Sequence, residues 1–301
     1  MADFDLSMID MTQTVPQSTA SLINAGGMLM LSVFLVLAFI FFVRYKSKVV
    51  PLLLGIFAYI IFIFMGCNVF ISMLPEFAKQ NGKAGGIEIC VTALVMTVFF
   101  TVARICIANI MRGRYDGPGD ALIAGLGLGV GDAAVYGFTT IMVFGVLAAA
   151  INQTGLEELL LNTGLPAADA VDLYVSTILP LIKVPSVVWL LMGISLCMDM
   201  LMNVALMMIN CGVAQGKLSS MWYFISAAFN FVMLALFTFN STAYRTVFEA
   251  VLPFGIKVIV FIILLVIVIR IDKEKLGSTL SKDLKGYTYQ RMPHFGNLKN
   301  K

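Results

Sequence analysis

The sequence predicts an all-α, polytopic transmembrane bundle of about seven helices, on the grounds of composition, hydropathy and charge placement. Hydrophobic residues make up 60% of the chain and charged residues only 12%, against about 25% charged in a typical soluble protein. Several separate apolar runs reach the length of about 20 residues that a helix needs to cross the roughly 30 Å hydrocarbon core. The basic residues gather on alternate connections between these runs. We therefore expect an integral membrane protein.

A change of composition bounds each span of this transmembrane domain, residues 22–270. The first run ends at the basic turn RYKSK, the second at Pro75, and the third at RGRYDGPGD. The fifth and sixth are separated by a short turn with Lys217, and NSTAYRTVFE precedes the seventh. The predicted spans are 22–43, 49–74, 87–111, 121–151, 186–213, 219–239 and 251–269, between an N-terminal segment, 1–21, and a basic tail, 271–301.

The fourth run, 121–151, is longer than a straight crossing requires. At 1.5 Å per residue it would make a helix of about 46 Å, so we expect it to tilt or to break at its glycines. The connection that follows, 152–185, places Leu156, Leu159 and Leu160 beside an acidic face. It predicts one or two amphipathic helices that lie at the outer interface or cap the bundle.

Basic residues set the orientation, because they concentrate on the cytoplasmic side of membrane proteins. With the N-terminus outside and the C-terminus in the cytoplasm, fourteen Lys and Arg residues fall on cytoplasmic segments and four on the opposite ones. The reverse orientation would invert this ratio. We expect a multi-pass protein of the cell (plasma) membrane whose first partner is the lipid bilayer, with no nucleic acid partner.

Residue types exclude several chemistries. The five cysteines lie in apolar segments, so no disulfide framework is expected. The single histidine, His294, lies in the polar tail, which excludes an embedded zinc site and a Ser–His or Cys–His dyad. The glycine-rich stretch has no preceding strand and no following Lys-Ser/Thr, so it is not a phosphate-binding loop. We expect no metal and no cofactor.

Three charged side chains are expected inside spans: Arg104, Asp132 and Asp199. Helix rise places them about 10, 16 and 21 Å from the cytoplasmic ends of their spans. Polar residues on other helices fall at similar depth, namely Asn203, Asn230 and Thr101. Charges in hydrocarbon normally face the bundle interior or a wet cavity. The residues therefore predict either a structural polar network, with Arg104 paired to Asp132, or a binding cavity, or a catalytic site.

Asp132 follows a stretch in which glycine alternates with larger apolar residues, at Gly125, Gly127, Gly129 and Gly131. Glycines four apart let membrane helices approach closely, so we expect them to serve helix packing. GVGD at 129–132 also fits the GxGD pattern of intramembrane aspartyl proteases. The "YD" at Tyr115 and Asp116 lies in a loop, and the late PAL motif of those families is absent.

From its first to its sixth span the chain resembles the YhfC family of bacterial membrane proteins, putative peptidases related to the glutamic intramembrane proteases that process CAAX proteins and bacteriocins. The segments that carry the likeness are RYKSKVVPLLLGIFAYIIFIFM, TVARICIANIM and DALIAGLGLGVGDAAVYG. The resemblance implies an acidic pair ahead of Arg104, a His and then a Glu in the glycine-rich stretch, and histidines on the fifth and sixth helices.

This chain departs from that pattern at each of those positions. Apolar residues and Thr around Phe100 and Thr101 replace the acidic pair, and Leu128 and Asp132 stand in place of the His and the Glu. The two later histidines fall on Asn203 and Asn230. Asparagine donates hydrogen bonds but carries no proton at neutral pH.

The resemblance therefore implies a bacterial CAAX-protease-like pseudoenzyme, proteolytically inactive, that binds a transmembrane segment, lipid or other partner in an intramembrane polar cavity. The residues expected to line it are Arg104, Asp132, Asp199, Asn203, Asn230 and Thr101. One alternative is a divergent active peptidase that uses Asp132. Another is a transporter or channel subunit with the charged residues along a solute path.

Overall fold

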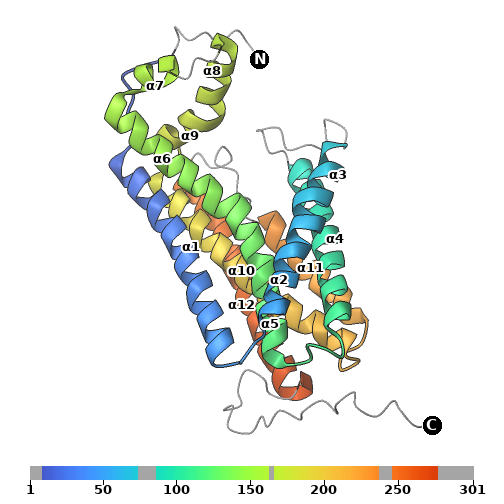
Figure 1. Ribbon diagram of the computed structural model, residues 1–301. Helices are drawn as coiled ribbons and strands as arrows, with labels where there is room; N and C mark the ends of the chain where they lie inside the picture. The colour runs from blue at the N-terminus through green and yellow to red at the C-terminus, as the bar shows by residue number, and fades with distance from the viewer. Residues whose placement is uncertain (1–8, 74–85, 163–165, 237–245, 277–301) are drawn as a thin grey trace, which may run out of the picture.

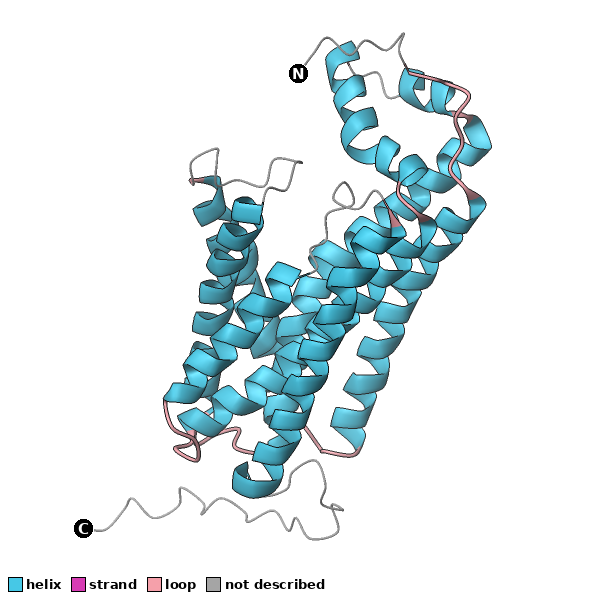
Figure 2. Cartoon of the chain, turned by 180° about the vertical axis from the view of Figure 1, so that it is seen from behind, coloured by secondary structure: helices cyan, strands magenta, loops and turns pink. Residues whose placement is uncertain are grey.

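Helices make up most of the chain, and the long ones run roughly side by side with a group of short helices at one end (Figure 1). The computed structural model describes residues 9–73, 86–162, 166–236 and 246–276. Within these residues the chain forms helices and turns and no strand, as the view from behind shows (Figure 2). The prediction of an all-α fold is thus confirmed for the described part of the chain.

The elements follow one another in an order close to that of the predicted spans. Their bounds are α1 Gln17–Val43, α2 Val49–Ala58, η2 Tyr59–Cys67, α3 Asn68–Ser72, α4 Gly86–Met111, α5 Pro118–Asp132, η4 Ala133–Phe138, α6 Thr139–Thr154, α7 Leu156–Asn162, α8 Ala167–Leu173, η5 Tyr174–Ile178, α9 Leu179–Lys183, α10 Ser186–Ala214, α11 Met221–Leu236, α12 Val247–Ile271 and η6 Asp272–Leu276, where η marks a π-helix.

Five stretches of the described residues are long and apolar enough to cross a membrane: Gln17–Val43, Val49–Ser72, Ile89–Met111, Ser186–Ala214 and Val247–Leu276. Two shorter apolar helices, Ile141–Thr154 and Met221–Leu236, fall in the predicted fourth and sixth spans. The 16 described residues of α11 rise about 24 Å, less than the hydrocarbon core. The predicted number of seven spans therefore stays a prediction.

Helix α10 is the centre of the bundle. In its most apolar window 72% of the residues are buried, against 22–28% in the other four candidate spans. Those four present large apolar side chains outward, for example Phe39, Phe57 and Val98, as helices in contact with lipid do. Helix α10 instead packs on its neighbours on all sides, and at one crossing a Cβ on Gly193 would lie 2.6 Å from the Cα of Gly26 in α1.

The glycines of α5 fit this helix between α10 and α2. A Cβ on Gly125 would lie 2.6 Å from the Cα of Val204, and a Cβ on Gly129 would lie 2.8 Å from the Cα of Met200, both in α10. The other two glycines face α2, where Gly127 meets the Leu52 carbonyl and Gly131 meets the ring of Tyr59. Residues four apart share a helix face, so the alternating pattern gives α5 two faces on which backbones touch.

The predicted fourth span is one helical run of three parts, α5, η4 and α6. The run passes through the glycines as an α-helix and widens into the π-helix η4 directly after Asp132. In Figure 1 it rises from α5, low in the view, to the short helices at the top. Such π segments occur often at functional sites.

The connection 152–185 forms α7, α8, η5 and α9, more elements than the one or two expected. These helices pack with the chain before α1 around buried apolar side chains, among them Ile9, Val15 and Leu156. Asn152, near the end of α6, holds the chain before α1 by two hydrogen bonds. Its Oδ1 accepts from the Val15 N–H at 2.9 Å, and its Nδ2 donates to the Val15 carbonyl at 2.8 Å. We call this part of the molecule the short-helix end.

The opposite end, called the loop end below, carries the turns that join α1 to α2, α4 to α5 and α10 to α11. Asp120, in the first turn of α5, accepts a hydrogen bond from the backbone N–H of Lys48 at 2.9 Å. Gly119 lies against the same turn, because a Cβ there would be 2.5 Å from the Ser47 Oγ. Burial raises the pKa of the Asp120 carboxyl above its ordinary value, and the hydrogen bond from Lys48 opposes this effect only in part.

The close packing of α5 predicts that alanine destabilises the protein at Gly125 of α5 but not at Gly255 of α12. In G125A the new methyl meets the backbone of α10, which cannot move aside, and we expect a loss of about 1–3 kcal/mol in the free energy of unfolding. In G255A, a position on α12 with nothing within 4 Å of a Cβ, we expect no loss or a gain of about 0.5–1 kcal/mol from helix propensity. Thermal unfolding of detergent-solubilised protein measures both. Equal losses in the two variants would contradict close packing at Gly125.

The raised pKa of Asp120 predicts a pH-dependent contribution to stability. Below its ordinary value of 3.8 the carboxyl is protonated in both states. Between that value and the raised native pKa, the native state binds more protons than the unfolded state, so the free energy of unfolding falls as pH rises. We expect D120N, whose amide oxygen still accepts from Lys48, to lack this decrease and to be no less stable at neutral pH. Unfolding across about pH 4–8 measures the difference from the parent protein.

A second variant separates the titration from the hydrogen bond. D120A leaves the Lys48 N–H without its acceptor, and we expect it to lose about 1 kcal/mol relative to D120N at every pH. Parallel pH profiles for the parent protein and D120N would show that the carboxyl does not titrate as burial predicts.

Candidate functional site

Arg104 is the first of two charged groups around which buried polar side chains gather. It lies on α4 and is fully buried. Its Nη2 donates to the Oδ1 of Asn203 on α10 at 2.5 Å and to the Oδ1 of Asn230 on α11 at 2.8 Å. The guanidinium carbon also lies 5.3 Å from the ring centroid of Phe100, one turn earlier on α4, within the range of a cation–π interaction. One cation thus joins three helices.

Asn230 extends this group back to α4. Its Nδ2 lies 3.4 Å from the Oγ1 of Thr97, at the long limit of a hydrogen bond. Thr97 and Asn230 are both buried. Because Thr97 lies on the same helix as Arg104, α11 is bound to α4 at two positions.

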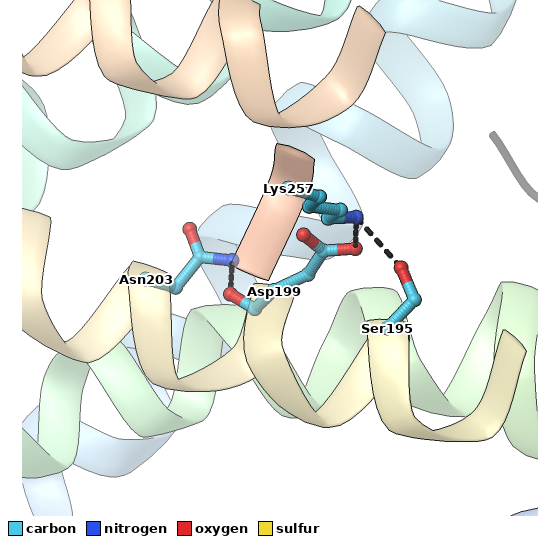
Figure 3. A network of polar contacts seen from close by, with 4 residues as sticks. All are labelled: Ser195, Asp199, Asn203 and Lys257. Carbon is cyan, nitrogen blue, oxygen red and sulfur yellow. Dashed lines mark hydrogen bonds and ion pairs between the residues drawn. The ribbon is translucent and has the colours of Figure 1, made fainter. Parts of the chain in front are cut away.

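The second charged group is an ion pair between α10 and α12. The Nζ of Lys257 lies 2.8 Å from the Oδ2 of Asp199 and donates to the Oγ of Ser195 at 2.7 Å (Figure 3). Lys257 is fully buried, and Asp199 and Ser195 are buried as well. Ser195 and Asp199 are four residues apart and so share the face of α10 that receives the lysine.

Asn203 joins the two groups. Its Nδ2 donates to the backbone carbonyl of Asp199, one turn earlier on α10, at 3.0 Å (Figure 3). Its Oδ1 is the acceptor for Arg104. The side-chain amide is thereby fixed in one orientation, with its oxygen toward the guanidinium. Four helices, α4, α10, α11 and α12, meet in one polar network.

The structure brings together three of the predicted residues, Arg104, Asn203 and Asn230, in direct contact. Asp199 lies one turn away, and Thr101 lies on α4 between Thr97 and Arg104. Asp132 ends α5, but its side chain lies outside the described part of the structure. The predicted ion pair of Arg104 with Asp132 therefore stays a prediction, as does the cavity around these residues.

Lys257 is missing from the charged residues that were predicted to lie in spans. It is the eleventh residue of α12, a helix whose mean hydropathy of 3.0 is the highest of the candidate spans. When hydropathy is averaged along α12, the many apolar residues outweigh the single lysine, so the average gives no sign of it. A search of each span for single Lys or Arg residues would have found it, although not its partner.

Two buried oxygen atoms of the network form no hydrogen bond with the described residues: the Oδ1 of Asp199 and the Oγ1 of Thr101. Buried polar atoms normally have a partner. These two atoms offer an acceptor and a hydroxyl at the depth of the two charged groups. They are the positions at which a further polar group would gain a hydrogen bond.

The network contains a serine beside a lysine, which some hydrolases use as nucleophile and base. Here the same lysine is paired with Asp199 at 2.8 Å. An ammonium held by a carboxylate donates protons and takes none from a serine, so Ser195 acts as an acceptor. The described contacts therefore support helix association and give Ser195 no general base for nucleophilic attack.

In the part of the chain that the structure describes, no three His, Cys, Asp or Glu side chains lie close enough together to hold a metal ion. Comparison of the sequence with protein-family models and with curated proteins, and of the structure with solved structures, finds no match.

The Asp199–Lys257 pair predicts non-additive mutations. K257M leaves the Asp199 carboxylate buried without its cation, and we expect a loss of about 3–5 kcal/mol in the free energy of unfolding. D199L should cost a similar amount, whereas K257M/D199L removes both charges and should regain most of the loss. A double-mutant cycle on detergent-solubilised protein measures the coupling.

The exposed pair of Arg270 and Glu274, with the same separation of 2.8 Å, supplies the control. R270Q should change the free energy of unfolding by less than about 1 kcal/mol, because water screens an exposed pair. Additive losses in the K257M and D199L cycle would mean that the buried charges do not depend on each other.

Proposed function

We propose that this protein is a seven-span integral membrane protein of the bacterial plasma membrane, with its N-terminus outside and its C-terminus in the cytoplasm. The distribution of charge at the two ends of the described structure supports this orientation. Acidic side chains prevail at the short-helix end, and basic ones prevail at the loop end, where they favour the cytoplasmic side. The described charges of the short-helix end are Asp10, Glu157, Glu158, Asp169, Asp172, Glu249 and Lys183. Those of the loop end are Arg44, Lys46, Lys48, Arg112, Arg114, Asp116, Asp120, Lys217, Arg270, Asp272, Lys273, Glu274 and Lys275.

The proposed function is to bind a transmembrane segment or a lipid at the buried polar network, as a proteolytically inactive relative of YhfC-type peptidases. One observation carries this proposal: Arg104 is held by the two amides, Asn203 and Asn230, at the positions where the resemblance implies histidines. A histidine transfers protons at neutral pH, and an amide does not. A site with this set of groups recognises by hydrogen bonds and moves no proton.

Buried polar atoms on α4 and α10, two of the helices that the network joins, supply the recognition. The Oδ1 of Asp199 and the Oγ1 of Thr101 are buried and have no hydrogen-bond partner among the described residues. A polar side chain of a partner helix, or a lipid hydroxyl, would hydrogen-bond to them in a medium without competing water. Such interhelical hydrogen bonds contribute about 0.6 kcal/mol on average and up to about 2 kcal/mol each.

A transporter or channel subunit is the second candidate, and the Asp199–Lys257 pair favours it. Paired charges at membrane depth mark ion and substrate pathways in many membrane proteins. The described network has Lys257 and Asp199 on facing helices, so that separation of α12 from α10 would expose both charges. A divergent peptidase that uses Asp132 is the remaining alternative.

Photo-crosslinking from the network tests the proposed function. A photoreactive amino acid at Thr101, in the full-length protein in native membranes, should capture a lipid or a membrane-spanning segment that mass spectrometry identifies. We expect N203A and N230A to lower the yield about tenfold, which corresponds to about 1.4 kcal/mol of binding free energy. N210A supplies the matched control, because Asn210 is a buried asparagine of α10 that bonds to Ser226 and not to Arg104.

The same variants distinguish the alternatives. If the crosslinking yield were the same in N203A, N230A and N210A, Asn203 and Asn230 would serve only as contacts between helices. Solute or proton flux in proteoliposomes that is lost in D199N would replace the binding proposal by transport. Cleavage of a helical substrate that is lost in D132N would replace it by peptidase activity.

A further inference from the structure

Two turns that touch at the loop end carry five basic side chains, and one of them, Arg44, has its guanidinium carbon 6.0 Å from the ring centroid of Tyr45. Lys46 and Lys48 lie in the turn between α1 and α2, and Arg112 and Arg114 lie in the turn between α4 and α5. The Nζ of Lys48 lies 3.5 Å from the Arg114 carbonyl oxygen and 5.0 Å from the ring centroid of Tyr115. We call Lys46, Lys48, Arg112 and Arg114 the basic platform.

The backbone holds these turns in fixed shapes. Lys46 has a φ of 49° and Gly113 a φ of 77°, both in the left-handed region. The Ser47 N–H donates to the Phe41 carbonyl at 3.1 Å, which closes the first turn onto the end of α1. The basic side chains of the platform are therefore presented by ordered loops whose conformation does not have to form on binding.

The two carboxylates beside the platform are engaged with other donors. Asp120 is buried and accepts from the backbone N–H of Lys48. Asp116 accepts from the Gly113 N–H at 3.0 and 3.1 Å, and from the Nε2 of Gln215 at 3.4 Å. Lys46, Arg112 and Arg114 are exposed. The platform thus presents cations outward, while Asp120 is buried and the exposed carboxylate of Asp116 is engaged by hydrogen bonds from Gly113 and Gln215.

Exposed apolar side chains adjoin the platform along the chain. Val43 ends α1 directly before the first turn, Val49 begins α2 directly after it, and Ile110 lies one turn or less before the second. An anionic phospholipid has the matching arrangement, with a charged phosphate above acyl chains. We infer that the basic platform binds the phosphate of an anionic phospholipid headgroup while the apolar helix ends contact its acyl chains.

The last turn of α12 and the π-helix η6 that follows it form a different basic segment at the same end of the molecule. Arg270, Lys273 and Lys275 alternate there with Asp272 and Glu274. Arg270 donates to Glu274 at 2.8 Å. The acids of this segment lie among its bases, so its net positive charge is small. It serves as an internal control, because three of its basic residues can be neutralised, as many as in the platform variant.

Lipid binding by the full-length protein in detergent tests the inference. Native mass spectrometry measures the retention of phosphatidylglycerol relative to phosphatidylcholine in the parent protein, in K46N/R112Q/R114Q and in R270Q/K273Q/K275Q. Asn is chosen at position 46 because it tolerates a positive φ. Each basic side chain near an anionic headgroup contributes about fivefold in affinity, so the first variant should lose roughly 100-fold in phosphatidylglycerol affinity. The second should lose less than about fivefold.

Two outcomes would overturn the inference. Equal losses in the two triple variants would mean that net charge at this end, and not the platform, attracts the lipid. No loss in either would mean that phosphatidylglycerol binds elsewhere.

Inorganic phosphate at the same concentration tests the source of the phosphate. We expect it neither to displace phosphatidylglycerol nor to raise the melting temperature, because it lacks acyl chains to contact the apolar helix ends. Displacement of the lipid by free phosphate would assign the platform to a soluble anion.

Discussion

The cost of burying a charged side chain away from water governs the centre of this protein. Insertion of an Arg, Lys or Asp at the middle of a membrane helix costs about 2.5–3.5 kcal/mol. Arg104 and Lys257 find their partners on α10, with Asn203 and Asp199 as acceptors. Because α10 supplies both acceptors within one turn, α4 and α12 must pack against it. The most buried helix of the bundle is thus also the one that offsets the charges of its neighbours.

Close approach of α5 to α10 follows from glycine rather than from charge. A Cβ on Gly125 or on Gly129 would meet the backbone of α10 at Val204 and Met200, respectively. Val204 directly follows Asn203, so the glycine face of α5 meets α10 at the level of the polar network. Helix α5 then continues into the π-helix η4. The glycines therefore allow α5 to touch α10, and at the same level the polar network joins α10 to α4, α11 and α12.

The two ends of the molecule differ in charge and in construction. The short-helix end is a small packed unit in which Asn152 fixes the segment before α1 by two hydrogen bonds to Val15. The loop end consists of tight turns held together by contacts such as Asp120 to Lys48. These connections help to set the orientation of the helices that carry the polar network.

The sequence by itself predicted the all-helical fold and three residues of the polar network. Hydropathy predicted helices of membrane length, and the depth estimate placed Arg104, Asn203 and Asn230 in one layer, where the structure has them in contact. These succeeded because helix rise and face are local properties that spacing along the chain sets. Only the tertiary structure decided which polar groups meet. Lys257 and Asp199 are 58 residues apart, and no local periodicity relates a lysine on α12 to a carboxylate on α10. Their pairing depends on the rotation and height of two packed helices, which side-chain contacts along the whole bundle set together.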